Sequence, residues 1–274
     1  MNCSSPAVQN ETRADKRFLE DMERQLVGWS DPIARLRGAL ERNELVAYAQ
    51  PVVSLRGPES IAFAEILVRL REEERALLPP GEFLPVFEHF QMMRDLDAWV
   101  VRNAVDRLAR GACVPRFSIN VSEQTLGDSG FASYVLSELK RTGVPPDALI
   151  FEVGEMDALA KPTVATRFSL SMKEIGCSTL LDGFGRRSVT FASLTSMQVG
   201  YVKVDGVIVR KLGTSDMARS KLNAIVIVGD ATGVAVIGES VESAEPLAQL
   251  KAAGVGLAQG HGLQPPKPLD DFAR

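Results

Sequence analysis

From Leu45 onward, short apolar runs rich in β-branched residues alternate with longer amphipathic stretches. Eight strands that alternate with helices over about 230 residues predict an α/β fold, a (β/α)8 barrel. The alternative, a doubly wound open sheet, is less favoured because no dinucleotide-type glycine fingerprint follows the first strand. The predicted strands are 45–53, 61–69, 116–121, 148–153, 178–182, 201–204, 234–237 and 255–258. The predicted helices are 83–90, 95–108, 131–141, 163–174, 215–232 and 244–253.

The chain divides into a short N-terminal segment and one large domain. Residues 1–30 are expected to be flexible, with Phe18, Met22 and Leu26 on one face of a short helix. That helix is interpreted as a connection to a sensor domain or a protein partner. The alternative, slightly favoured, is a solvated helix packed on the barrel. Residues 31–274 form the predicted domain.

Several helix ends carry capping signals. Ser30-Asp31-Pro32 predicts the start of a helix that runs to about Arg42, with a capping side chain before a first-turn proline. Glycines follow four of the predicted helices and are expected to end them in a left-handed conformation. These glycines are Gly143, Gly176, Gly233 and Gly254.

Composition restricts the classes of partner and compartment. With 274 residues, 45% hydrophobic content and a net charge of −4, the chain resembles an ordinary soluble globular protein. The negative charge predicts no general affinity for DNA or an anionic membrane, although a local site can still bind a nucleotide. The sequence shows neither a signal-peptide pattern nor ~20 consecutive apolar residues, so a cytoplasmic location is predicted. Cys113 and Cys177 are expected to be buried free thiols.

Polar residues interrupt or end the apolar runs, at positions that converge on one face of a barrel. Carboxylate and amide oxygens without Cys or His favour Mg²⁺ or Mn²⁺ over zinc. Lys203 is suited to hold a water or to neutralise a developing oxyanion, so metal-assisted phosphate-ester hydrolysis is predicted. Taken singly, each acid is more simply a turn or helix cap, and Lys203 a rim residue, so the prediction depends on the whole set. The set is Glu65, Asn120, Glu152, Asp182, Lys203, Glu239 and Gln259.

Motifs around these residues resemble the EAL domain family of cyclic di-GMP phosphodiesterases. The resemblance runs from about Arg35 to Phe272. It implies a TIM-like barrel with an antiparallel first strand, and hydrolysis of cyclic di-GMP to pGpG with two Mg²⁺ or Mn²⁺ ions. The motifs are Tyr48-Ala-Gln-Pro-Val-Val53, Ala64-Glu-Ile-Leu-Val-Arg69, Ile119-Asn-Val-Ser122, Phe151-Glu-Val-Gly-Glu155, Leu181-Asp-Gly-Phe-Gly185, Val202-Lys-Val-Asp205, Gly238-Glu-Ser-Val-Glu242 and Ala258-Gln-Gly260.

The resemblance also implies roles for individual residues. Lys203 matches a lysine that orients the nucleophilic water, and Gln259 a residue near that water. Glu155 matches a glutamate that steadies the loop after Asp182. The implied ligands of the first metal are Glu65, Asn120, Glu152 and Asp182, and the second metal is served by Glu239 and Asp182. The implied dinucleotide contacts are Gln50, Leu67 and Arg69.

The chain departs from the family pattern at four places. Gly183 stands where active members carry a second Asp that binds the second metal. The loop that follows has Arg186-Arg187 in place of Thr-Gly, and because this loop takes part in dimer contacts in the family, the change bears on a homodimer. Ile66 replaces the signature Ala, expected to be a packing change only, and Ser240 replaces a Gly.

These departures set the functional expectation. The predicted protein binds cyclic di-GMP and metal but hydrolyses the dinucleotide weakly or not at all, because the second ion has lost a carboxylate ligand. The first alternative is a fully active phosphodiesterase, in which Glu239, a water or an arginine holds the second ion. The second is a protein-interaction adapter that binds no nucleotide.

Overall fold

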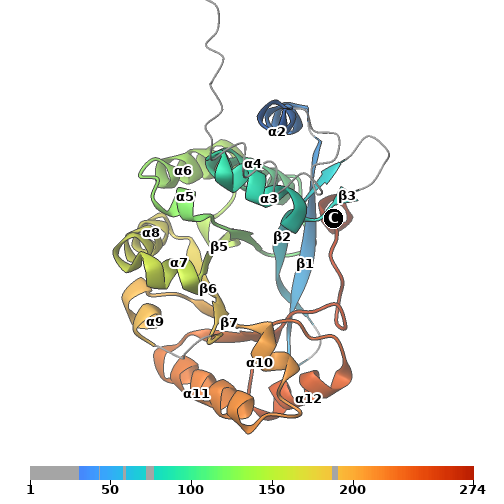
Figure 1. Ribbon diagram of the computed structural model, residues 1–274, viewed down its shortest axis with the longest axis vertical. Helices are drawn as coiled ribbons and strands as arrows, with labels where there is room; N and C mark the ends of the chain where they lie inside the picture. Colours follow the sequence, from blue (N-terminus) through green and yellow to red (C-terminus); the bar gives the residue numbers. More distant parts are fainter. Residues whose placement is uncertain (1–30, 43, 58–59, 72–76, 187–190) are drawn as a thin grey trace, which may run out of the picture.

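The computed structural model describes residues 31–42, 44–57, 60–71, 77–186 and 191–274. In these ranges eight strands close into a barrel (Figure 1). The first strand runs antiparallel to both of its neighbours in the barrel, and the other seven run parallel to one another. The predicted TIM-like barrel with an antiparallel first strand is therefore confirmed. Its strands are β1 (Leu45–Ser54), β2 (Ile61–Arg71), β4 (Phe117–Asn120), β5 (Leu149–Gly154), β6 (Ser178–Phe184), β7 (Tyr201–Val204), β8 (Ala235–Gly238) and β9 (Leu257–Ala258).

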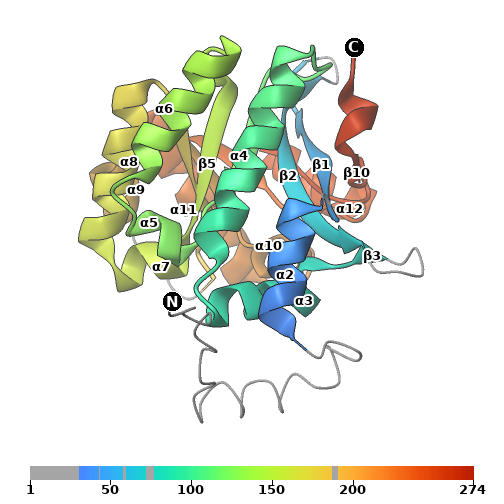
Figure 2. The same cartoon turned by 90° about the horizontal axis from the view of Figure 1, so that it is seen from above.

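Helices surround the barrel on its outer side (Figures 1 and 2). None of the described helices is both long and apolar enough to cross a membrane. The longer helices are α2 (Pro32–Glu41), α3 (Pro80–His89), α4 (Met93–Ala109), α6 (Phe131–Thr142), α8 (Pro162–Ile175), α11 (Asp216–Thr232) and α12 (Ala244–Ala252). The short ones are α5 (Glu123–Leu126), α7 (Glu155–Ala160), α9 (Ala192–Met197), α10 (Gly206–Arg210), and the 3₁₀ turns η1 (Pro146–Ala148) and η2 (Leu269–Phe272).

The capping predictions hold where the structure describes them. The Asp31 side chain accepts a hydrogen bond from the Ala34 amide, and Pro32 is the first residue of α2. All four predicted glycines have φ between +71° and +99°. The N-terminal segment 1–30, with its predicted helix around Phe18, lies outside the described residues, as does Arg187.

The barrel interior has an apolar lower tier and a polar upper tier. A small cluster of fully buried side chains, Phe63, Ile150, Leu180 and Ile237 among them, fills the lower tier. Because side chains on a strand alternate between two faces, the residue two positions later points inward again, one tier nearer the carboxyl end. Those later residues are Glu65, Glu152, Asp182 and Glu239. The strand register itself therefore gathers the acids at the mouth of the barrel.

Two kinds of short element were not predicted, and one prediction about a cysteine is wrong. The short helices α5, α7, α9 and α10 lie between a strand and the element that follows it, and they are too brief to show a helical period. The two-residue strands β3 (Leu77–Leu78) and β10 (Lys267–Pro268) extend the sheet beyond the barrel. Cys177 is buried as expected, but the prediction for Cys113 is wrong: it is exposed, because Ala112 and Val114 on either side are the residues that turn inward.

Candidate active site

A buried lysine lies at the centre of the polar tier. The Lys203 ammonium is 2.6 Å from Glu152 Oε2, 2.9 Å from Glu65 Oε2 and 3.6 Å from Asp182 Oδ1. Only 2% of the lysine side chain is exposed. Burial alone would lower the pKa of Lys203, but the three carboxylates raise it well above its ordinary value. The lysine is therefore a fixed positive charge on the barrel axis.

Glu65 connects the lysine to both amide side chains of the set. Asn120 Nδ2 donates to Glu65 Oε1 at 2.8 Å, and Gln259 Nε2 donates to Glu65 Oε2 at 2.9 Å. Burial acts to raise the pKa of Glu65, but the Lys203 charge and these hydrogen bonds outweigh it and lower the pKa. Glu65 is therefore held as a carboxylate even though it lies inside the barrel.

Glu152 and Asp182 each present an unsatisfied oxygen. Burial, followed by the negative charge of Glu65, raises the pKa of Glu152 to about 8. Among the described residues, Glu152 Oε1 and Asp182 Oδ1 are buried and have no hydrogen-bond partner. Buried acceptors without partners are costly and call for an explanation such as an ion or a water. The donor types, carboxylate and amide oxygen, fit a hard divalent cation.

The position of Lys203 also explains why the acids are not arranged as a preformed metal-binding site. Within the described ranges, no three Asp, Glu, His or Cys side chains converge closely enough to hold a metal ion. The Lys203 ammonium occupies the point toward which Glu65, Glu152 and Asp182 are directed. A cation and this ammonium compete for the same oxygens.

Glu239 lies near enough to Asp182 for the two charges to interact. Its Oε1 accepts a hydrogen bond from the Gly206 amide at 2.5 Å, at the first residue of α10. Burial, followed by the charge of Asp182, raises the pKa of Glu239 to about 7. Gly183, the residue after Asp182, has φ +67° and contributes no side-chain ligand atom. A Cβ at this glycine would have no described heavy atom within 4 Å.

Glu155 is the first residue of α7 and contacts the segment that follows Asp182. Both of its carboxylate oxygens lie 3.2 Å from the Gly185 amide, which donates to them. The side chain is buried, and burial raises its pKa. The contact has the geometry expected of a residue that steadies this loop.

The expected dinucleotide contacts lie on β1 and β2, where Gln50 pairs with Glu65 of the lysine cluster across the two strands. Gln50 Nε2 donates to the carbonyl of Gln264 at 3.2 Å, and the Arg69 guanidinium lies 5.7 Å from the centre of the Tyr48 ring. Leu67 pairs with Tyr48 across the two strands. Ile66 points outward into the main core, with 2% exposure, so the signature change is a packing change as predicted.

Comparison with known proteins agrees with the motifs. The EAL domain family model matches residues 33–266. This chain belongs to the EAL domain family. The match covers every barrel strand and every acid of the polar tier.

Two curated relatives and one solved structure place this EAL domain among its neighbours. The cyclic di-GMP phosphodiesterase PdeB of Shewanella oneidensis is 28% identical over 244 residues, covering 87% of this chain and 28% of PdeB. PdeR of Escherichia coli, also a cyclic di-GMP phosphodiesterase, is 32% identical over 90% of this chain and 37% of PdeR. The chain thus spans between 28% and 37% of the length of these two relatives. The FimX EAL domain of Pseudomonas aeruginosa bound to c-di-GMP matches with a TM-score of 0.81 at 30% identity, covering 87% and 97% of the two chains.

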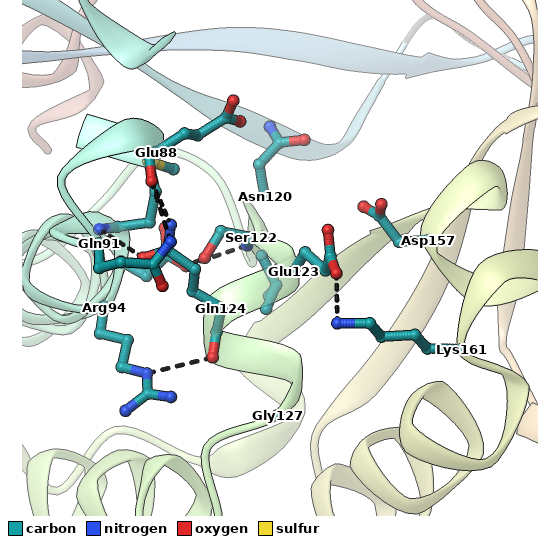
Figure 3. A pocket seen from close by; sticks show the side chains of 13 residues that line it. Glu88, Gln91, Arg94, Asn120, Ser122, Glu123, Gln124, Gly127, Asp157 and Lys161 are labelled. Carbon is teal, nitrogen blue, oxygen red and sulfur yellow. Dashed lines mark hydrogen bonds and ion pairs between the residues drawn. The ribbon is translucent and has the colours of Figure 1, made fainter. Parts of the chain in front are cut away.

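A polar pocket of about 770 Å³ adjoins the site, and the sequence analysis missed it (Figure 3). Asn120 is shared between the pocket and the lysine cluster. Glu88 and Asp157 both line it, and burial together with neighbouring acids raises the pKa of each. Lys161 forms an ion pair with Glu123 on one wall. The one sequence feature that could have indicated this pocket is an acid, Asp97, among the apolar residues on the buried face of α4.

Asp97, on α4, is one of the residues that line this pocket. It is 4% exposed, and it accepts hydrogen bonds from the Ser122 amide at 3.0 Å and the Ser122 hydroxyl at 2.7 Å. Burial raises its pKa from 3.8 to about 6. Since the folded state binds this proton more tightly than the unfolded state, the associated stability is present at low pH and is lost as pH rises from about 4 to 6.

Asp97→Asn is expected to remove that pH dependence. An amide oxygen can accept both Ser122 bonds without a buried charge, so the variant should be more stable than the parent by about 2 kcal/mol at pH 7.5 and nearly equal at pH 4. Urea unfolding of the metal-free EAL domain at several pH values measures the difference. A difference that stays constant across this range would contradict the assignment.

Ser240, which replaces the family glycine, adopts a strained backbone. Its φ is +56°, in the left-handed region that favours glycine. The side chain lies against Gly206, where an added Cβ would fall 2.3 Å from Ser240 Oγ. The strain is therefore located beside the amide that binds Glu239.

Ser240→Gly is expected to stabilise this EAL domain by about 0.5–1 kcal/mol, because glycine adopts positive φ without a steric penalty. Ser240→Ala keeps the strain and removes only the hydroxyl, so it should bring no gain. Denaturant unfolding of the three proteins distinguishes the cases. An equal gain in both variants would assign the effect to the hydroxyl rather than to the backbone.

Proposed function

We propose that this EAL domain acts in the cytoplasm as a cyclic di-GMP receptor or slow phosphodiesterase, binding the dinucleotide with Mg²⁺ or Mn²⁺ at the barrel mouth. The observation that carries this proposal is an intact set of oxygen ligands beside an incomplete one. Glu65, Asn120, Glu152 and Asp182 lie together, whereas Gly183 has no side chain to offer. The domain boundary at residue 31 is part of the same proposal.

The first set would hold one ion. The unsatisfied oxygens of Glu152 and Asp182 support this assignment. Lys203 would have to withdraw its ammonium from the shared point, and from there it can hold a water or stabilise charge on the phosphate. A bound divalent ion supplies Lewis acidity to the phosphate and a lowered pKa to a bound water.

The second ion would depend on Asp182 and Glu239 alone. Glu239 has one oxygen bonded to the Gly206 amide, so it offers a single free oxygen without breaking that bond. Arg186 does not fill the gap, since its side chain is 68% exposed and its Nε lies 3.9 Å from Asp205 Oδ2. Loss of one effective ion is expected to cost on the order of 4–6 kcal/mol in the barrier to hydrolysis.

A fully active phosphodiesterase remains the second candidate, favoured by the presence of Lys203, Glu239 and Gln259 and by the names of the relatives. The adapter that binds no nucleotide is less favoured. A protein that no longer binds the nucleotide is expected to have lost some of these ligand residues. Here Glu65, Asn120 and Glu152 are all present. Asn120 donates to Glu65, and both glutamates accept from Lys203.

Single-turnover hydrolysis tests the proposal. Excess protein is incubated with cyclic di-GMP and Mn²⁺, and substrate is resolved from pGpG by chromatography over hours. We expect tight binding in a parallel titration and slow or undetectable pGpG, with both lost in Glu65→Ala. Rapid pGpG formation would establish the active enzyme, and absence of binding would leave the adapter.

A further inference from the structure

The backbone that carries Asp182 lies in a β-bulge of the barrel. The β6–β7 ladder is regular up to Leu181 and resumes at Phe184 with a shifted register. Asp182 and Gly183 form this irregular stretch. A β-bulge re-aims the side chain it carries, so the direction of the Asp182 carboxylate depends on how both sides of the bulge are fixed.

The ladder holds the bulge on both sides, at Leu181 and again at Phe184, whose carbonyl accepts a hydrogen bond from the Asp205 amide at 3.1 Å. The glycines on either side of Phe184, Gly183 and Gly185, have φ +67° and +84°. Because glycine has the largest conformational freedom of any residue, the turn at Gly185, just beyond the ladder, depends on contacts made by its own amide and carbonyl.

Gly185 is anchored from opposite directions by two helices. Its amide donates to the Glu155 carboxylate of α7 at 3.2 Å. Its carbonyl accepts from the Lys221 ammonium of α11 at 2.8 Å. Glu155 is 3% exposed, and Lys221 is the cation whose charge acts on it. Lys221 therefore both holds the Gly185 carbonyl and balances the buried acid that holds the Gly185 amide.

We propose that Lys221 is a positioning residue of the site, which together with Glu155 holds Gly185 and so fixes the direction in which Asp182 presents its carboxylate to a bound cation. The inference rests on the proposed metal-dependent function and extends it to a residue on an outer helix. Lys221 lies 36 positions from Gly185 in the sequence and belongs to no motif of the family resemblance.

The test compares Lys221→Gln with a conservative and a matched control. Lys221→Arg keeps a cationic donor at the same place. Arg219→Gln removes another cation of α11 that also donates to a backbone carbonyl, that of Leu212 at 2.7 Å. The first readout is hydrogen exchange at the Gly185 amide in the metal-free full chain, which requires neither ligand nor turnover.

We expect exchange at Gly185 to be about tenfold faster in Lys221→Gln, because a hydrogen bond from a charged group no longer opposes local opening. Lys221→Arg should restore the slow exchange, and Arg219→Gln should leave it unchanged. The second readout is Mn²⁺ binding by calorimetry, where the dissociation constant should rise about three- to tenfold in Lys221→Gln only.

Two results would overturn the proposal. One is unchanged Gly185 exchange in Lys221→Gln, and the other is an equal change in Arg219→Gln, which would mark a general effect of charge on α11. If exchange responds but Mn²⁺ affinity does not, the positioning role is overturned and only a structural contact remains. A parent protein that binds neither Mn²⁺ nor cyclic di-GMP would instead overturn the proposed function.

Discussion

Lys203→Met is expected to lower the free energy of unfolding of the metal-free protein by about 3–5 kcal/mol at pH 7.5, because the change leaves Glu65, Glu152 and Asp182 without their shared counter-charge inside the barrel. For a domain of this size the melting temperature should fall by about 6–15 °C. Thermal and urea unfolding in the presence of a chelator measure the loss. Hydrolysis and metal-dependent binding are assayed on the same protein.

Two further features of this result distinguish an electrostatic cause from lost packing. Mn²⁺ should restore part of the stability, since it places positive charge among the same oxygens. Lower pH should shrink the deficit, because the acids lose their charge once protonated. The matched control is Lys161→Met, which breaks an exposed ion pair with Glu123 and should change stability by about 1 kcal/mol or less. A deficit unaffected by both Mn²⁺ and pH would contradict the charge-balance account.

Gly183→Asp is expected to raise the rate of cyclic di-GMP hydrolysis by about a thousandfold, corresponding to about 4 kcal/mol of barrier. The variant places a carboxylate next to Asp182 in the chain, at the position where the family resemblance implies a ligand of the second ion. The Cβ position is open, but the φ of +67° strains any side chain there, Asp less than most residues, so the gain in rate is expected together with some loss of stability. Single-turnover hydrolysis with Mn²⁺ measures the gain.

Gly183→Asn is the control for geometry without charge. Asparagine has nearly the same shape and the same tolerance of left-handed backbone, but it lacks the anionic oxygen that a second ion requires. Its rate should remain near that of the parent. If Gly183→Asp does not accelerate hydrolysis, or if Gly183→Asn accelerates it equally, the missing carboxylate is not the cause of slow turnover.

Much of the fold follows from local pattern. The strand at 201–204 is found at the predicted residues, and the ends of the others lie within two residues of their predicted positions. The helix cap at Asp31 and the four helix ends at glycines could also be predicted from the sequence, because each depends only on neighbours along the chain. The misjudged exposure of Cys113 shows the limit, because local hydrophobicity does not tell which residue of a turn faces inward.

The sequence could predict which residues form the polar tier, but not how their side chains are arranged around one another. Each acid stands two residues after an apolar inward position on its own strand, which is a period-two pattern visible in the sequence. That Lys203 lies between Glu65 and Glu152 is not visible, because these residues are separated by 138 and 51 positions and meet only when the barrel closes.

The sequence by itself determined the order of the barrel strands and the tier of acids and amides, since these depend on residue type and short-range periodicity, and the family resemblance singled out Gly183. The tertiary structure alone decided that Lys203 occupies the centre of the acids, that Gly206 binds Glu239 and that Lys221 holds Gly185. These contacts depend on barrel closure, strand register and helix packing. Such long-range geometry sets distances and burial, and therefore the charges and pKa values on which the chemistry of the site depends.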